Sequence, residues 1–212
     1  MTREILVEIS DNLQEGKANA VVELVLEALE AGVPPRTILD QGLLAGMGII
    51  GGKFKANEVF VPEVLVAARA MNRGAEALKP ALAAEGVRAR GVAVIGTVRG
   101  DWHDIGKNLV KMMMEGKGIE MIDIGVDAPP ERFLEAAREH GAAIVCCSAL
   151  LTTTMGEIKP VVDLIKGSEL GGKVKIMVGG APITQGFCEQ VGADCYTPDA
   201  ATAADAAISL LR

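Results

Sequence analysis

The second part of the sequence alternates short apolar runs with amphipathic stretches, and this alternation restricts the fold more than any other feature. Each apolar run has the length of a buried strand, and the stretch that follows it has helical periodicity. Five strand–helix pairs of this kind predict an α/β domain with a doubly wound, parallel, five-stranded sheet. The expected strands are residues 92–97, 119–124, 142–148, 174–178 and 193–197, and the expected helices are residues 106–117, 130–140, 155–166, 183–191 and 200–211.

The first part of the sequence, residues 2–84, carries only helical signals. Apolar residues recur every three or four positions, and four helices with short connections predict an all-α four-helix bundle. Glycines mark the expected helix ends, at Gly16, Gly32 and Gly51–Gly52. Prolines mark two of the expected helix starts, at Pro34–Pro35 and at Pro62. The last helix is expected to continue through Leu78.

The change from one pattern to the other locates the domain boundary. Lys79–Pro80 through Gly86 reads as the connection, because proline and glycine interrupt regular structure there. The predicted domains are therefore residues 1–86 and residues 87–212, with residues 79–90 as the expected hinge between them.

Composition and charge exclude several classes of function. The formal net charge is −7 and basic residues are dispersed, whereas a nucleic-acid-binding protein needs a basic face. No apolar stretch has the length of a membrane span, and the N-terminus lacks the apolar segment of a signal peptide, so we expect a cytoplasmic protein with no membrane partner. The four cysteines form no C-x-x-C pair, which favours buried free thiols over a zinc or disulfide site.

Three places depart from the regular pattern, and each directly follows a predicted strand. They are the turn Gly100–Gly106, the hydroxyl-rich run Ser148–Thr154 and the pair Gly179–Gly180. The carboxyl ends of parallel strands meet at one edge of a sheet, where open α/β sheets bind their ligands. We therefore expect these three loops to form one ligand site, in which glycines permit close approach of the backbone and hydroxyls bond polar groups of the ligand.

His103 is the candidate metal ligand of this site. It lies on a strand-to-helix turn, and Asp101 precedes it by two residues. An imidazole that binds a metal commonly has its second nitrogen fixed by such a carboxylate. Taken alone, His103 would be interpreted as a surface or helix-capping residue rather than as a metal ligand. The threonines at 152–154 alone would indicate a helix N-terminus, and Gly179–Gly180 alone the end of a strand.

Together these residues resemble the signature of a known family. Asp101-x-His103-x-x-Gly106 is separated by residues 107–147 from Ser148-x-Leu150, which is separated by residues 151–178 from Gly179–Gly180. This pattern is similar to the cobalamin-binding domain of methionine synthase, of certain mutases and of small corrinoid proteins that carry methyl groups. The resemblance implies a Rossmann-like cobalamin-binding domain at residues 87–212 and a helical cap domain at residues 1–86.

The resemblance also implies a role for each matching residue. His103 would be the lower axial ligand of cobalt, replacing the corrinoid's own base in a base-off arrangement. Asp101 would accept a hydrogen bond from the imidazole, and Thr154, which stands where methionine synthase has a serine, would complete a proton relay. The remaining cofactor-binding residues would be those of the turn, Gly100, Trp102, Asp104, Ile105 and Gly106, and those around the nucleotide tail, Ser148, Leu150, Thr152, Gly179, Gly180 and Ala200.

The helical part is similar to the cap that covers the upper face of the corrin ring in methionine synthase. In that cap a phenylalanine and a leucine seven residues apart shield the methyl group, and Phe54 and Val61 have the same spacing here. Without the resemblance, both residues read as ordinary core positions.

A cap and a corrinoid domain with no substrate domain imply a free-standing methyl carrier. Such a protein is one subunit of a multi-component methyltransferase, and its cobalamin or related corrinoid is methylated in the working state. Its implied partners are a substrate-specific methyltransferase, an acceptor methyltransferase that uses tetrahydrofolate or a thiol, and a reductive activase. The alternatives are the small subunit of an adenosylcobalamin-dependent mutase, a corrinoid-sensing regulator, and a flavodoxin-like module with another ligand.

Overall fold

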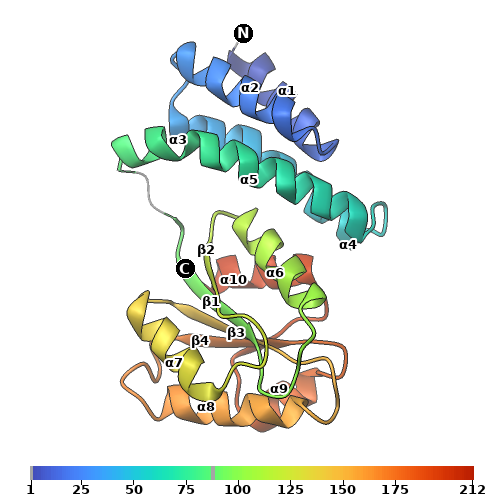
Figure 1. The fold of residues 1–212 in the computed structure, drawn as a ribbon, viewed down its shortest axis with the longest axis vertical. Helices are drawn as coiled ribbons and strands as arrows, with labels where there is room; N and C mark the ends of the chain where they lie inside the picture. The colour runs from blue at the N-terminus through green and yellow to red at the C-terminus, as the bar shows by residue number, and fades with distance from the viewer. Residues whose placement is uncertain (1, 87–88) are drawn as a thin grey trace. The chain divides into compact units, whose positions relative to one another are not determined.

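The computed structural model describes residues 2–86 and 89–212, and its chain divides into two compact units (Figure 1). One unit consists of Met1–Ala89 with Gly116–Gly118, and the other of Arg90–Glu115 with Ile119–Arg212. Positions 87 and 88, where we predicted the domain boundary and part of the hinge, lie outside the described residues. The boundary after residue 86 and the hinge therefore stay predictions.

The first unit is helical throughout its regular elements. Its helices are α1 (Thr2–Gln14), α2 (Ala18–Glu30), α3 (Pro35–Thr37), the π-helical segment η1 (Ile38–Leu43), α4 (Leu44–Lys55) and α5 (Val61–Ala84). Because α3, η1 and α4 follow one another without a break, the described part of this unit contains four helical segments, and the predicted all-α bundle is confirmed. Gly16 and Gly32 end the first two helices with positive φ angles of 72° and 77°.

Two predicted helix ends in this unit are wrong. Helix α4 continues through Gly51–Gly52 to Lys55, and α5 continues past Pro80 to Ala84. Gly51 is buried in the bundle, and packing outweighs the cost of about 1 kcal/mol that glycine imposes on a helix. Beyond Pro80 the chain reads Ala-Leu-Ala-Ala, which are strong helix formers, so α5 extends into the stretch that the sequence indicated as a connection.

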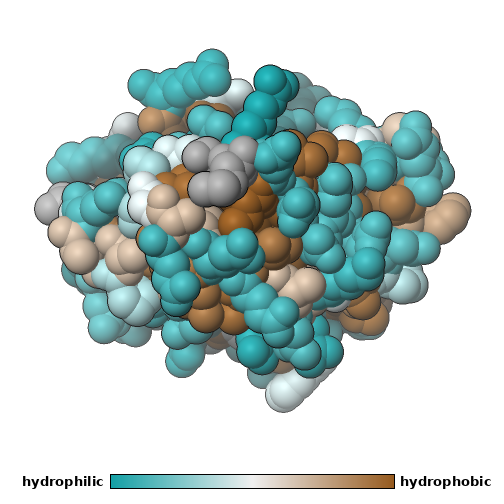
Figure 2. Space-filling view, turned by 90° about the horizontal axis from the view of Figure 1, so that it is seen from above, coloured by the Kyte–Doolittle hydropathy of each residue, from teal (hydrophilic) through white to brown (hydrophobic). Residues whose placement is uncertain are grey.

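The core of the helical unit consists of aliphatic side chains from all four segments. Helix α5 packs along α2 and α4, and α1 packs against α2, η1 and α4. A β-carbon on Gly46 would lie 3.0 Å from the carbonyl oxygen of Ser10, so a glycine there allows α4 to approach α1 closely. Seen from above, the surface shows mostly hydrophilic residues, with hydrophobic ones between them (Figure 2).

The second unit contains a parallel sheet with the strand order β2-β1-β3-β4-β5. Its strands are β1 (Val92–Thr97), β2 (Glu120–Asp123), β3 (Ile144–Ser148), β4 (Lys175–Gly179) and β5 (Cys195–Tyr196). The register pairs Thr97 with Ser148 and Ser148 with Gly179, so the last residues of the three central strands form one row. The predicted five-stranded parallel sheet is confirmed, although β5 is shorter than the sequence indicated.

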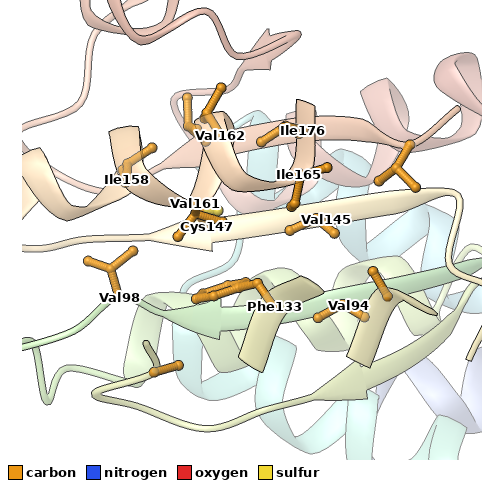
Figure 3. Close-up of a cluster of buried hydrophobic side chains, with 14 of the residues drawn as sticks. Val94, Val98, Phe133, Val145, Cys147, Ile158, Val161, Val162, Ile165 and Ile176 are labelled. Carbon is orange, nitrogen blue, oxygen red and sulfur yellow. The ribbon is translucent and has the colours of Figure 1, made fainter. Parts of the chain in front are cut away.

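Helices cover both faces of this sheet, as a doubly wound fold requires. They are α6 (Ile105–Glu115), α7 (Pro130–Glu139), the 3₁₀ segment η2 (Met155–Glu157), α8 (Ile158–Lys166), α9 (Gln185–Val191) and α10 (Ala200–Leu210). Helices α7 and α8 lie on one face, and α6 packs with α10 on the other (Figure 1). Phe133 of α7 is fully buried between Val94 and Val145 of the sheet and Val161 of α8 (Figure 3).

All four cysteines are free thiols, as expected, and those at positions 146, 147 and 188 are buried, whereas Cys195, also expected to be buried, is half-buried. Burial raises the pKa of Cys146 to about 12, so this thiol stays protonated and packs as a small apolar residue. In the described part of the chain, no helix has both the length and the apolar character needed to cross a membrane.

Truncation of Phe133 tests the position of this core. We expect Phe133→Ala to lower the free energy of unfolding by about 3–5 kcal/mol, because the change leaves a cavity between sheet and helices. Phe60→Ala is the matched control, since Phe60 is 65% exposed, and it should change the value by no more than about 0.5 kcal/mol. Urea unfolding followed by circular dichroism measures both, and equal losses would contradict this account of the core.

Candidate functional site

The carboxylate of Asp101 lies at the centre of the predicted site. It is fully buried, and its two oxygens face different loops. Oδ1 lies 2.8 Å from Nδ1 of His103 and accepts a hydrogen bond from the backbone N–H of the same residue at 3.1 Å. Oδ2 accepts hydrogen bonds from the Thr154 hydroxyl at 2.7 Å and from the backbone N–H of Leu150 at 2.8 Å. The structure thus brings together four residues that the sequence placed in one site: Asp101, His103, Leu150 and Thr154.

The charge on Asp101 determines which ring nitrogen of His103 carries the proton. Burial alone would raise the pKa of Asp101, but hydrogen bonds from Thr154, Leu150 and His103 outweigh burial and hold the pKa well below its usual range. An ionised carboxylate only accepts hydrogen bonds, so Nδ1 of His103 carries the proton that points at Asp101. In the neutral imidazole, Nε2 then keeps its lone pair, and within the described residues no hydrogen bond occupies that atom.

The turn that carries His103 is fixed by its backbone. Gly100 has a φ of +78°, a conformation that favours glycine, and the hydroxyl of buried Thr97 donates to the His103 carbonyl at 2.9 Å. Helix α6 begins two residues after His103. The imidazole is left half exposed, so a ligand can reach it from solvent.

Exposed apolar side chains surround this turn. Trp102 is 72% exposed and Ile105 is 75% exposed, and Leu150 and Leu151 on the neighbouring loop are exposed as well. Large apolar residues gathered beside a polar group indicate a surface that binds a ligand. Asp104 and Gly106, the other predicted residues of the turn, are also exposed, and the Asp104 carbonyl accepts the backbone N–H of Asn108 at 2.8 Å.

The hydroxyl-rich loop after β3 differs in one respect from the sequence-based expectation. Thr154 stands at the N-cap position of η2, but its side chain caps no helix N–H, because the hydroxyl lies 2.7 Å from the Asp101 carboxylate and 3.1 Å from the Leu151 carbonyl. Thr152 is exposed, and Ser148 is half-buried in the row of strand ends. Ala200 is buried at the start of α10.

Position 180 requires a glycine because the backbone of the neighbouring loop leaves no room for a β-carbon. Its φ is +131°, and a β-carbon there would lie 1.8 Å from the carbonyl oxygen of Ala149. Gly179 has ordinary space, because its β-carbon would lie 3.5 Å from the Thr197 carbonyl oxygen. The glycine at 180 therefore lets the loops after β3 and β4 approach each other, which explains its place in the motif independently of any ligand.

Phe54 and Val61 belong to the helical unit. They flank the connection between α4 and α5, Phe54 in the last turn of one helix and Val61 at the start of the other, and both are half-buried. Their proposed role as a shield for the ligand stays a prediction.

Three further residues of this region were missed in the sequence. Lys107 is buried, and its Nζ lies 2.6 Å and 2.7 Å from the two carboxylate oxygens of Asp123. Burial would raise the pKa of Asp123, but the bonds from Lys107 lower it. Asp127 accepts the backbone N–H of Gly100 on Oδ1 at 2.7 Å. The signal that could have revealed both acids is their position at the carboxyl end of β2, on the edge where the ligand site was expected.

The sequence matches the family described as B12 binding domain over residues 91–208, and a second family of the same description over residues 5–79. The chain belongs to the B12-binding family. It is 43% identical to the dimethylamine corrinoid protein of Methanosarcina barkeri, with 98% of each chain covered. It is 42% identical to dimethylamine corrinoid protein 3 of Methanosarcina acetivorans, with 98% of this chain and 97% of that protein covered.

A solved structure extends the similarity to both units of the fold. The crystal structure of the methanol:cobalamin methyltransferase complex MtaBC from Methanosarcina barkeri contains a chain that is 32% identical to this one. The TM-score is 0.88, and the match covers 98% of this chain and 80% of that chain. A helical cap followed by a Rossmann-like cobalamin-binding domain, as the resemblance implied, is thus confirmed as the fold.

The residues of the sheet edge fit the corrinoid that this family binds. A single imidazole offers one nitrogen, and a corrin ring brings the other ligands of its cobalt with it. His103 meets this requirement, because Asp101 fixes one ring nitrogen and leaves the other free on a half-exposed ring. The exposed apolar residues beside it suit the large apolar ring.

Replacing each of the two glycines by alanine tests whether the loops after β3 and β4 need a glycine at position 180 to approach each other. We expect Gly180→Ala to lower the free energy of unfolding by about 1–3 kcal/mol, because alanine is strained at this φ and meets the Ala149 carbonyl. Gly179→Ala is the matched control and should cost less than about 1 kcal/mol. Urea unfolding of the cofactor-free variants measures both changes. An unfolding free energy that is unchanged in Gly180→Ala would refute the steric argument.

The ionisation of Asp101 predicts how stability depends on pH. Folding lowers the pKa of Asp101, so its stabilising effect is complete above the ordinary value of about 3.9 and is lost as the pH falls below that value. The difference in unfolding free energy between the wild type and Asp101→Asn should therefore be largest above about pH 5 and shrink from about pH 4 downward.

Unfolding by urea at a series of pH values measures this difference. Asp163→Asn serves as the control, because that side chain is 59% exposed, and its effect should stay small at every pH. A constant difference between the wild type and Asp101→Asn would show that the buried carboxylate does not titrate as described.

Proposed function

We propose that this chain is a corrinoid protein that carries a methyl group from a substrate-specific methyltransferase to an acceptor methyltransferase. In this proposal the corrinoid binds base-off, with His103 as the lower axial ligand of cobalt. The observation that carries the proposal is the 2.8 Å contact between Nδ1 of His103 and the buried carboxylate of Asp101, which leaves Nε2 as the donor atom. The acceptor is tetrahydrofolate or a thiol.

The bound corrinoid supplies a cobalt centre that can accept a methyl group and donate it again. The protein's own residues bind the cofactor and control the proton on His103. The ionised Asp101 accepts the hydrogen bond of Nδ1, and the Thr154 hydroxyl holds the other carboxylate oxygen at 2.7 Å. In this proposal Asp101 and Thr154 would form the proton relay behind His103.

The residues around the sheet edge would hold the rest of the cofactor. In this proposal the turn residues lie against the corrin ring, with Trp102 and Ile105 as its exposed apolar contacts. The nucleotide tail would lie along the strand ends, lined by Ser148, Leu150, Thr152, Gly179, Gly180 and Ala200. Phe54 and Val61 of the cap would shield the upper face of the ring.

The relatives support a methylated amine as the methyl donor. Two relatives named as dimethylamine corrinoid proteins align with this chain over nearly the whole length of both sequences. The similar chain in the methanol:cobalamin methyltransferase complex supports docking on a methyltransferase that binds the substrate. We further propose a reductive activase as a partner, because oxidised cobalt must be reduced before it can accept a methyl group. The match of residues 5–79 favours this function over a mutase subunit.

Replacement of His103 tests the proposal. We expect His103→Gly protein, reconstituted with cobalamin, to show the absorption spectrum of a corrinoid without a lower imidazole ligand. Added imidazole should restore the wild-type spectrum, because it can occupy the space of the missing side chain. His140→Gly is the matched control, since His140 is the other histidine of the chain and caps α7 in a different loop. An unchanged spectrum in His103→Gly would refute axial ligation.

Methyl transfer from defined donors separates the carrier function from binding alone. The reconstituted protein is mixed with methyltransferases specific for dimethylamine, monomethylamine, trimethylamine or methanol, and methylation is followed by absorption. We expect rapid methylation with a methylamine-specific enzyme and at least a tenfold lower rate in His103→Gly, about 1.4 kcal/mol in barrier height. Failure with every methyltransferase would refute the carrier function, and methylation with the methanol enzyme alone would refute the amine donor.

A further inference from the structure

Asp127, in the loop after β2, forms two hydrogen bonds with the turn that carries His103. Its Oδ1 accepts the backbone N–H of Gly100 at 2.7 Å, and its own N–H donates to the carbonyl of Asp101 at 2.9 Å. Next to it, Val98 and Ala128 form an isolated parallel bridge. The loop after β2 is thereby attached to the start of the His103 turn by backbone and side chain together.

The backbone of Asp127 is in an unusual conformation. Its φ is +51°, in the left-handed region that most residues with a side chain avoid. Gly100, its partner, has a φ of +78°. A glycine at position 127 would relieve the backbone but would supply no carboxylate for Gly100, whereas an aspartate tolerates this region and supplies the acceptor. Outliers of this kind gather at functional sites, where the surrounding structure maintains them.

The rest of the His103 turn is held by other groups. The buried Lys107 forms an ion pair with the half-buried Asp123 at the far end of the turn, and the Thr97 hydroxyl donates to the His103 carbonyl in its middle. The carboxylate of Asp101 is already occupied by Thr154, Leu150 and His103. Asp127 is therefore the side chain that anchors the beginning of the turn.

We propose that Asp127 is a positioning residue for axial ligation, which holds the backbone of Gly100 and Asp101 so that the Asp101–His103 pair is set before the corrinoid binds. This inference rests on the proposed function, in which His103 ligates cobalt. Asp127 acts through the backbone of Gly100 and Asp101, and the Asp101 carboxylate in turn contacts His103. Without it, the carboxylate of Asp101 must both orient His103 and restrain its own backbone.

Two substitutions at position 127 distinguish the effect of the carboxylate from the effect of the left-handed backbone conformation. Asp127→Gly keeps the left-handed backbone and removes the acceptor, whereas Asp127→Asn keeps an oxygen that can accept from Gly100. Asp194→Gly is the matched control, because Asp194 forms the same pair of bonds with the backbone of Ile176 before β5. That pair lies at the amino end of β4 and β5, away from the three loops of the site.

The first measurement uses the cofactor-free protein. We expect amide hydrogen exchange in residues 100–105 to be about tenfold faster in Asp127→Gly, since a hydrogen bond to a charged group is lost. Exchange in this segment should stay at the wild-type rate in Asp127→Asn and in Asp194→Gly. Equal protection in the wild type and Asp127→Gly would overturn the proposal.

The second measurement uses the cobalamin-loaded protein and its absorption spectrum. We expect the ratio of His-ligated to His-free corrinoid to fall about tenfold in Asp127→Gly, to recover in Asp127→Asn, and to be unchanged in Asp194→Gly. An unchanged ratio in Asp127→Gly, beside a changed spectrum in His103→Gly, would overturn this inference and leave the proposed function intact. An unchanged spectrum in His103→Gly would instead refute the proposed function.

Discussion

The buried carboxylate of Asp101 is the interaction on which the site depends. An ionised carboxylate removed from water is tolerated only when its oxygens are bonded, and here each oxygen accepts from a different part of the fold. One oxygen binds His103 in the turn after β1, and the other binds Thr154 and Leu150 in the loop after β3. The same group thus joins two strand ends and determines which imidazole nitrogen faces outward.

The strand order explains why these two loops meet. β1 and β3 are neighbours in the sheet although β2 lies between them in the chain, and the row of Thr97, Ser148 and Gly179 keeps their ends level. The helices that follow β1 and β3 cover opposite faces, so this pair of strands is the point of the sheet at which doubly wound folds bind their ligands. The topology therefore fixes the place of the site, and the residues of the loops fix its chemistry.

The sequence predicted the strands, the turn and the three loops because each is a local pattern of apolar, glycine and hydroxyl residues. It missed other contacts between segments far apart in the chain, whereas the resemblance implied the one between Asp101 and Thr154. Asp127 binds Gly100, and Lys107 binds Asp123, and no periodicity reveals which loops will face each other. The two helix ends failed for other reasons. Packing of α4 outweighed the low helix propensity of Gly51–Gly52, and the strong helix formers after Pro80 carried α5 past the proline.

Thr154 shows how a small difference from the resembling family fits the fold. Methionine synthase has a serine there, and the added methyl group must be accommodated without moving the hydroxyl. A β-carbon on Gly100 would lie 3.7 Å from Cγ2 of Thr154, an ordinary contact distance, so the methyl group meets no steric conflict at the turn. Because a β-branched side chain has few χ1 rotamers, the threonine loses little freedom when its Oγ1 is directed at Asp101. The added methyl group is thus accommodated beside the turn, and the hydroxyl supports the carboxylate that orients His103.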